Sequence, residues 1–160
     1  MPNYINISVV HLKNPEELDR ALRIRKQVFH VEQGYSMEIE LDGQDDTAQH
    51  WVATCDKINE DGTIEHNFDI GVVRLIPKEE GVAKLGRLAV LPCGRGLSIG
   101  KKLVDAFIAY CKENGFHTIV LHSQYPRRGF YEKCGFSAKE GQDQVFEEAG
   151  TPHIKMWLHP

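Results

Sequence analysis

The chain has 160 residues, of which 41% are hydrophobic and 26% are charged, and its formal net charge is −4 with histidine neutral. These proportions are typical of one soluble globular domain and exclude a collagen-like, coiled-coil or wholly disordered chain. The slight excess of acidic residues also argues against a protein whose main function is to coat nucleic acid, because such proteins carry a dense basic surface.

The first half of the chain predicts a strand, a helix and a hairpin. Residues 4–11 alternate in part between apolar and polar side chains and are rich in β-branched residues, which indicates a strand. Residues 15–30 carry apolar side chains at helical spacing. Strands are predicted at 50–55 and 68–77, and the turn between them contains Asp61-Gly62, a pair that favours a tight reversal.

The second half predicts a longer alternation of strands and helices. Residues 83–91 end in an apolar run before a proline, which indicates a buried strand. From residue 97 the apolar side chains recur at steps of three and four, which predicts a helix that ends at Asn114-Gly115. The remaining predicted elements are a strand at 117–122, a short helix at 127–133 and strands at 145–148 and 153–159. The order β-α-β-β-β-α-β-α-β-β predicts an α/β (α+β) domain with a mixed sheet flanked by helices.

No segment of the sequence has the pattern of a membrane span or a signal peptide. A span needs about 18 consecutive apolar residues, and a signal peptide needs a basic and then an apolar stretch. The four cysteines form no Cys-x-x-Cys pair, so zinc-ribbon and thioredoxin sites lack their ligand spacing. We therefore expect one domain over residues 1–160 with reduced thiols, located in the cytoplasm, with access to the nucleus left open.

Residues 88–103 join the buried strand to the long helix through a glycine-rich turn. The first backbone N–H groups of a helix have no intrahelical partner, and the helix dipole adds partial positive charge, so such a turn can hold a phosphate. Gly94, Gly96 and Gly100 let a ligand approach the backbone closely, and Lys101 and Lys102 add positive charge. The segment therefore predicts a site for a phosphate-bearing ligand.

Three phosphate-binding patterns compete for this turn, beside the alternative of an ordinary helix start. A Walker A loop would need glycine at Arg95 and a hydroxyl residue at Lys102. A dinucleotide fingerprint that starts at Gly94 would need glycine at Ile99. The third pattern, Arg-x-x-Gly-x-Gly/Ala, matches Arg95-Gly-Leu-Ser98-Ile-Gly100 except that Ser98 takes the place of the middle glycine.

The third pattern resembles the coenzyme-binding turn of the GNAT superfamily of acetyltransferases. Leu85-Gly-Arg-Leu-Ala-Val-Leu-Pro92 resembles their central strand, and Phe130-Tyr-Glu-Lys-Cys-Gly-Phe136 resembles their Phe-Tyr-x-x-x-Gly-Phe signature. The segments 28–33 and 149–156, with the acidic stretch that leads to residue 50, resemble the small ElaA-like branch. The resemblance covers the chain from about residue 20 to its end and implies a GNAT-like single N-acetyltransferase domain with a mixed, splayed central sheet.

The resemblance also implies acetyl-CoA as the co-substrate, bound where the strands at 84–91 and 117–122 splay apart. The N–H of Val90 would stabilise the oxyanion that forms on the thioester carbonyl. The implied coenzyme-binding residues come from the central strand, from the turn and from the end of the next strand: Leu88, Ala89, Val90, Arg95, Gly96, Leu97, Ser98, Ile99, Gly100, Lys101 and Gln124.

Attack of an amine on a thioester requires a neutral amine and a proton for the departing thiolate. Tyr131, in the second signature, is the candidate general acid, and a core tyrosine with a locally bonded hydroxyl is the alternative. His153 follows Thr151-Pro152 and is the candidate general base, because imidazole can accept the ammonium proton near neutral pH. A structural histidine, with water taking the amine proton, is the alternative.

The candidate acceptor-binding residues are Glu32 and Gln33, at the end of the first helix, and His50, which can also be a hydrogen-bonded histidine at a strand start. Five acidic residues between Glu38 and Asp46 can attract a cationic amine or can form a solvated acidic loop. No set of histidine, cysteine and acidic residues has metal-ligand spacing, so no metal is expected.

These features predict an N-acetyltransferase that moves an acetyl group from acetyl-CoA to the primary amine of a small molecule by direct attack. Two alternatives stay open: a non-catalytic acyl-CoA-binding or regulatory module, which Ser98 slightly favours, and an acetyltransferase of a peptide or protein amine. Neither nucleic acid nor a membrane is expected as a partner. A final strand near the chain end that can pair across a dimer leaves a homodimer open.

Overall fold

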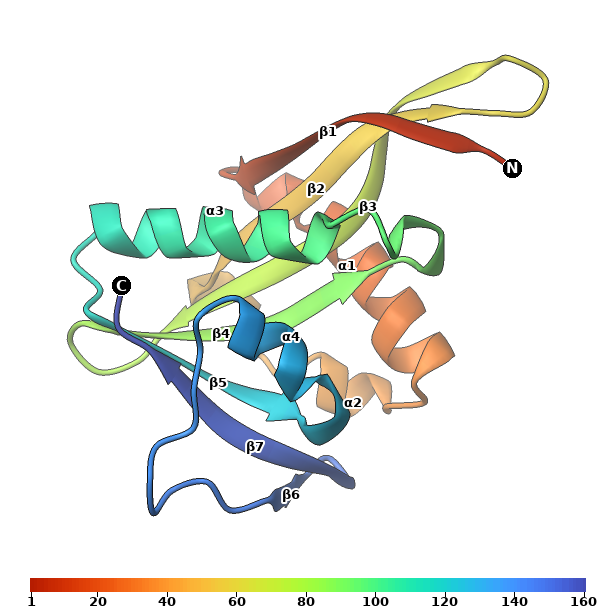
Figure 1. Cartoon of the computed structure of the whole chain (residues 1–160). Helices are drawn as coiled ribbons and strands as arrows, with labels where there is room; N and C mark the ends of the chain where they lie inside the picture. Colours follow the sequence, from red (N-terminus) through yellow and green to blue (C-terminus); the bar gives the residue numbers. More distant parts are fainter.

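The computed structural model describes residues 1–160 and contains a seven-stranded sheet with helices against both of its faces (Figure 1). The strand order is β1-β2-β3-β4-β5-β7-β6, and all neighbours are antiparallel except β4 and β5. The strands are β1 (Asn3–Leu12), β2 (Gln49–Ile58), β3 (Ile64–Pro77), β4 (Val82–Val90), β5 (Thr118–Gln124), β6 (Phe146–Glu148) and β7 (Thr151–Leu158). The α-helices are α1 (Leu18–Arg25), α2 (Met37–Glu40), α3 (Ile99–Glu113) and α4 (Arg128–Lys133).

The predicted order of strands and helices is confirmed, with differences at two places. The predicted helix at 15–30 is α1 followed by a π-helical segment, Lys26–Glu32, and the short helix α2 was not predicted. The hairpin of β2 and β3 is longer than predicted, because its polar ends still pair as far as Ile58 and Ile64. None of the helices is both long enough and apolar enough to cross a membrane.

Two apolar layers hold the helices on the sheet. On one face, α3 buries Leu103, Val104 and Phe107 against the central strands, which explains its apolar spacing of three and four residues. On the other face, α1 and the π-helical segment bury Ile24 and Val28. The central strands are therefore covered on both sides, and an opening in the sheet between them would lie between the two layers.

Such an opening occurs between β4 and β5. These two strands pair only from Val82 with Thr118 to Leu85 with Leu121, although β4 continues to Val90 and β5 to Gln124. Figure 1 shows the two strands diverging beyond this point. The predicted splay of the sheet is thus confirmed, and it leaves backbone groups of both strands without a partner strand.

A bulge in β4 lies at the start of this opening. Val72 of β3 is opposite Ala89, but Arg74 is opposite Gly86, so that two residues of β4, Arg87 and Leu88, face a single residue of β3. Arg87 has a φ of 51°, in the left-handed region that side chains rarely adopt. A bulge of this kind interrupts the alternation of side chains along a strand and redirects those that follow.

Candidate functional site

A cavity of about 910 Å³ lies where β4 and β5 separate. One end reaches the first turn of α3, at Gly100, and the other reaches His153 on β7 and Asp42 in the segment after α2. Strand β4 lines the length of the cavity from Lys84 to Val90. After the substrates that the sequence predicts for these two parts, we call the part near α3 the coenzyme end and the part near β7 and α2 the acceptor end.

The coenzyme end exposes backbone N–H groups of the first turn of α3. The first hydrogen bond of this helix runs from the Lys102 N–H to the Ser98 carbonyl at 3.1 Å, so the N–H groups of the three residues before Lys102 have no partner within the helix. Gly96 has a φ of 88°, and no atom lies within 4 Å of the place a Cβ would occupy. This open cradle, at the positive end of a 15-residue helix, fits a pyrophosphate group.

Ser98 immediately precedes α3 and has left-handed backbone angles, with φ 60° and ψ 24°. This conformation costs an L-residue roughly 1 kcal/mol, and glycine adopts it without that cost. The departure of Ser98 from the middle glycine of the pattern therefore leaves the shape of the turn intact and adds strain to it. The Ser98 side chain makes no capping hydrogen bond that could offset the strain.

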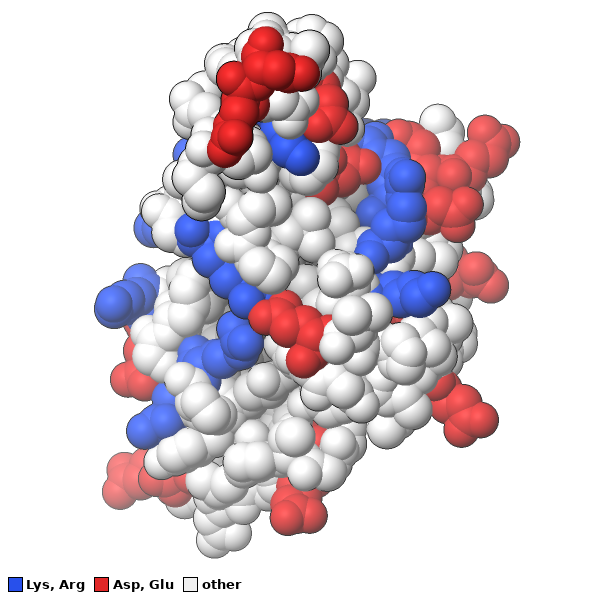
Figure 2. Space-filling view, turned by 90° about the vertical axis from the view of Figure 1, so that its right-hand side faces the viewer, with Lys and Arg blue, Asp and Glu red and all other residues white.

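Arg95 joins the turn to the end of the π-helical segment. Its two terminal nitrogens each lie 2.6 Å from a carboxylate oxygen of Glu32, and its Nε donates to the Val90 carbonyl at 3.2 Å. The hydrogen bonds from Arg95 hold the pKa of Glu32 below its usual range. Figure 2 shows the face at which these segments meet, with a band of basic side chains along its left-hand part and acidic side chains next to them at the centre.

The backbone of Val90 is oriented toward the opening between β4 and β5. The N–H of the next residue, Leu91, donates to Ile70 of β3 at 2.9 Å. Successive N–H groups of a strand point to opposite edges, so the N–H of Val90 points away from β3 and into the opening. A carbonyl oxygen placed there could accept this hydrogen bond.

Tyr131 of α4 also lines the cavity. Its ring packs edge-on against Phe130 and Phe136, with centroid distances of 5.1 Å and 6.1 Å. Its hydroxyl makes no hydrogen bond to any protein group, in contrast to a tyrosine that is satisfied locally. Burial raises the pKa of Tyr131, so the phenol is protonated at neutral pH and available as a donor.

His153 of β7 lines the acceptor end and is 6% exposed. Its Nδ1 lies 2.9 Å from the Thr151 carbonyl oxygen, which can only accept, so the proton of the neutral ring is on Nδ1 and the lone pair is on Nε2. The Glu148 carboxylate lies 3.8 Å from Nε2 and also accepts a hydrogen bond from His122 at 2.8 Å. The hydrogen bond from His122 lowers the pKa of Glu148, so the carboxylate is ionised beside His153.

Gln33 and Gln124 are brought together across the cavity. The Gln124 amide donates to the Gln33 side-chain oxygen at 2.9 Å, and both residues line the cavity. This bond links the end of the π-helical segment to the end of β5. The two residues were predicted for different substrates, Gln33 for the acceptor and Gln124 for the coenzyme, and they meet where the two ends of the cavity join.

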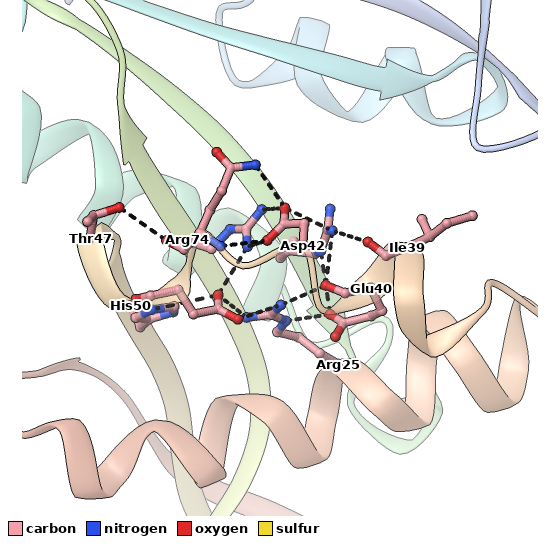
Figure 3. A network of polar contacts seen from close by, with 10 residues as sticks. Arg25, Ile39, Glu40, Asp42, Thr47, His50 and Arg74 are labelled. Atoms are coloured by element: carbon pink, nitrogen blue, oxygen red, sulfur yellow. Dashed lines mark hydrogen bonds and ion pairs between the residues drawn. The ribbon is translucent and has the colours of Figure 1, made fainter.

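The acidic residues between Glu38 and Asp46 are largely paired with buried arginines (Figure 3). Arg25, which is 0% exposed, bonds Glu40 at 2.5 Å and Asp45 at 2.7 Å. Arg74 forms two parallel hydrogen bonds to Asp42, at 2.9 Å and 2.8 Å. Three arginines, Arg25, Arg74 and Arg87, thus balance three carboxylates, Glu40, Asp42 and Asp45, and we call these six residues the arginine–carboxylate network.

Three of the predicted site residues do not line the cavity. His50 lies next to the arginine–carboxylate network, where its Nε2 is 3.1 Å from the Asp45 carbonyl oxygen, and burial lowers its pKa. Leu97 is 38% exposed, and Glu32 pairs with Arg95. The other predicted residues line the cavity: Leu88, Ala89, Val90, Arg95, Gly96, Ser98, Ile99, Gly100, Lys101, Gln124, Tyr131, His153 and Gln33.

Several charged residues of the cavity were not predicted, among them Lys84, Arg87 and Glu148. A signal for Lys84 was present, since it is a lysine between two apolar residues of a buried strand. The positions of Arg87 and Glu148 depend on the bulge of β4 and on the pairing of β6 with β7, for which the sequence carries no local signal. No group of three or more histidine, cysteine and acidic side chains is arranged to hold a metal ion.

Comparison with known proteins gives consistent matches over the chain. The sequence profile of the acetyltransferase (GNAT) family matches residues 18–136. An inferred acetyltransferase of Bacillus subtilis, BSU40680, is 32% identical over 154 residues, which cover 94% of this chain and 95% of that protein. The uncharacterised N-acetyltransferase YjcF of Bacillus subtilis is 29% identical, with 94% and 98% of the two chains covered. The crystal structure of Escherichia coli ElaA shares the fold, with a TM-score of 0.76 and 24% identity over 96% of this chain and 98% of that one.

Proposed function

The chain belongs to the GNAT family of acetyltransferases and is an acyltransferase, and on this premise we propose that it moves the acetyl group of acetyl-CoA to the primary amine of a small molecule. One observation carries the proposal. A single cavity joins an anion-binding helix end, an unbonded tyrosine hydroxyl and a histidine with a free ring nitrogen. These groups match the needs of direct aminolysis of a thioester, which are a held coenzyme, a proton donor and a proton acceptor.

The backbone would bind and activate the thioester. The N–H groups at the start of α3, with Gly96 and Lys101, would hold the pyrophosphate, and the chain of the coenzyme would follow the open edge of β4. The N–H of Val90 would donate to the carbonyl oxygen and stabilise the negative charge that develops on it, an effect usually worth several kcal/mol where water is excluded.

His153 would accept a proton from the attacking amine. Its Nε2 carries the lone pair because Nδ1 donates to the Thr151 carbonyl, and the Glu148 carboxylate would stabilise the imidazolium once it forms. As the new C–N bond forms, the amine nitrogen becomes positively charged and loses its proton to Nε2. Water as the proton acceptor is the alternative to this role.

Tyr131 would return a proton to the coenzyme. When the C–S bond breaks, the electron pair stays on sulfur, and the Tyr131 hydroxyl would donate its proton to that thiolate. Because burial raises the pKa of the phenol, the resulting tyrosinate is unstable and would regain a proton from solvent or from the His153 imidazolium. Atoms and charge then balance, and the products are an amide and free coenzyme A.

The test is to incubate the protein with acetyl-CoA and a panel of amines, amino acids, amino sugars and peptides and to follow the release of free thiol. We expect Tyr131→Phe to lower kcat by about 100-fold and to leave the Kd for the coenzyme unchanged. Tyr110→Phe, on the far part of α3 and outside the cavity, is the matched control and should keep full activity.

Two outcomes would favour the alternatives. Coenzyme binding without thiol release above background, with any amine, would identify a non-catalytic acyl-CoA-binding module. Faster turnover of peptides than of all small amines would identify a peptide or protein acetyltransferase. Full activity of Tyr131→Phe would remove Tyr131 from the mechanism but would leave the proposed reaction standing.

A further inference from the structure

Lys84 of β4 lines the acceptor end of the cavity without a partner. The residue is half-buried, yet its ammonium group makes no hydrogen bond and no ion pair with the protein. Buried and half-buried charges in proteins are normally paired, because an unpaired charge loses hydration without compensation. An unpaired lysine inside a cavity is therefore a candidate for binding a charge that arrives with a ligand.

The register of the sheet explains where Lys84 points. Its neighbours Ala83 and Leu85 belong to the core beneath α3, so Lys84 lies on the opposite face of the sheet. It is opposite Ile76 of β3, and Arg74 lies two residues from Ile76 on the same face. Lys84 thus shares a face with the arginine–carboxylate network and cannot turn toward solvent on the α3 side.

Arg87 reaches the same face because of the bulge in β4. Its Nη2 donates to the carbonyl oxygens of Ile39 and Glu40, at 3.0 Å and 3.1 Å, and lies 3.3 Å from an Asp42 carboxylate oxygen. Its Nη1 makes no hydrogen bond, and the residue lines the cavity. One side of the guanidinium is therefore fixed by the protein, which leaves the other side oriented and free to donate.

The carboxylates at this end of the cavity are already bonded to other groups. Asp42 is bonded to Arg74, Glu40 to Arg25, and Glu148 to His122. Burial lowers the pKa of Lys84, the charge of Glu148 raises it, and the charges of Lys78, Arg74 and Arg87 lower it further. A negative group bound beside Lys84 would relieve both the burial cost and this repulsion.

We propose that Lys84 and Arg87 bind an oxyanion on the acceptor, a carboxylate or a phosphate, so that the acceptor is an amine that also carries a negative charge. This inference rests on the proposed function, since it names the class of amine. The same molecule would present its amine to His153 and its oxyanion to the two cations of β4. The protein would then select against amines that lack the anion, because Lys84 would remain unpaired in their complexes.

Matched acceptors that differ only in the anion test the proposal. One pair is phenylalanine and phenethylamine, and the other is glucosamine 6-phosphate and glucosamine, so that the two pairs distinguish a carboxylate from a phosphate. For at least one pair we expect the anionic member to have a kcat/KM at least tenfold higher. Lys84→Met should reduce this ratio by about tenfold or more, and Lys84→Arg should restore part of it.

Lys112→Met is the matched control, because Lys112 is an exposed lysine in the last turn of α3, outside the cavity. This variant should keep the wild-type ratio. The proposal is overturned if wild-type protein prefers the neutral member of both pairs, or if Lys84→Met lowers kcat/KM equally for the anionic and neutral members.

A binding measurement separates this proposal from the proposed function. With coenzyme A present at saturation, the thermal midpoint of the wild type and of Lys84→Met is titrated with inorganic phosphate and with acetate. At least one anion should raise the midpoint of wild type and of Lys112→Met more than that of Lys84→Met. If the anion raises the midpoint of wild type more than that of Lys84→Met but no amine is acetylated, the proposed function alone fails. If amines are acetylated but the anion raises both midpoints equally, the anion site alone fails.

Discussion

Two neighbouring regions of the molecule handle charge in opposite ways. In the arginine–carboxylate network, the charged side chains are bonded to one another, and Arg25 and Glu40 are almost fully buried. In the adjoining cavity, the hydroxyl of Tyr131, the Nε2 of His153 and the ammonium of Lys84 have no hydrogen-bond partner in the protein. The two regions share four residues that line the cavity while belonging to the network: Glu40, Asp42, Arg74 and Arg87.

The difference separates residues that hold the site from residues that act in it. Paired buried charges fix the segment after α2 against β3 and β4, because breaking any one pair leaves an uncompensated charge. Unpaired groups in a cavity gain no stabilising bond from the protein and remain available to bond a ligand. Substitutions in the network should therefore change the free energy of unfolding, and substitutions in the cavity should change turnover.

The largest expected effect comes from Arg25→Met. This substitution leaves Glu40 buried without its partner and removes the bond to Asp45, so we expect the free energy of unfolding to fall by about 3–5 kcal/mol. Urea denaturation measures the change. The control is Asp105→Asn, which removes an exposed pair with Lys101 and should cost less than about 0.5 kcal/mol. Similar small losses in both variants would show that the network does not hold the fold.

The next effect is on catalysis. His153→Gln should lower kcat/KM by about 100-fold near pH 7 with little change in the free energy of unfolding, because a general base contributes roughly this much. The loss should shrink as the pH rises and the amine becomes neutral in solution. The exposed His66 on the β2–β3 hairpin supplies the control, His66→Gln, which should match wild type. A loss that is independent of pH would assign His153 a structural role.

Much of the cavity could be predicted because its coenzyme end is contiguous in sequence. A buried strand, a glycine-rich turn and an amphipathic helix follow one another within residues 83–113, and each carries its own pattern. Tyr131 and His153 were predicted from resemblance to a family and from the chemistry of their side chains, not from periodicity. Local patterns thus predict elements and turns, whereas the meeting of residues from α4, β4 and β7 depends on the order of strands in the sheet.

The acceptor end could not be predicted for three physical reasons. The helix α2 has only four residues, too few to show a period. The acidic residues at the end of α2 and after it find their partners on α1, β3 and β4, between 15 and 47 residues away. The bulge that turns Arg87 toward them depends on the register of β3 with β4. A run of acidic residues was therefore compatible with an amine-attracting surface, although most of it is neutralised by arginines.

The pairing in the network also predicts how stability depends on pH. Burial raises the pKa of Asp42, but the hydrogen bonds and charge of Arg74 outweigh it and hold the pKa below its usual value. A carboxyl whose pKa is lower in the folded state stabilises the fold above its unfolded pKa, near 4, and loses this contribution as the pH falls toward the folded value. The free energy of unfolding should therefore decline below about pH 4.

Asp42→Asn checks this dependence. The variant should be less stable than wild type at pH 7 by about 2 kcal/mol, and the gap should narrow as the pH is lowered from 5 to 2, because only wild type has the Asp42 carboxylate to protonate. Urea denaturation at several pH values measures the gap. Asp143→Asn, at an exposed loop position outside the network and without a hydrogen bond or ion pair, is the control and should follow wild type closely. A stability difference that does not change with pH would contradict the lowered pKa of Asp42 in the folded protein.

The smallest effect is expected at the coenzyme turn, where a strained residue stands among the unpaired N–H groups. Ser98→Gly should raise the free energy of unfolding by about 0.5 kcal/mol, because relief of the left-handed backbone slightly exceeds the greater freedom of glycine in the unfolded chain. Ser36→Gly should have the opposite sign, with a loss of a few tenths of a kcal/mol, since Ser36 has an extended backbone and its side chain caps α2. Urea denaturation of both variants gives the two signs directly. If the free energy of unfolding falls in both variants, the Ser98 side chain stabilises the turn. Serine in place of the middle glycine would then be a stabilising feature of this chain and not a source of strain.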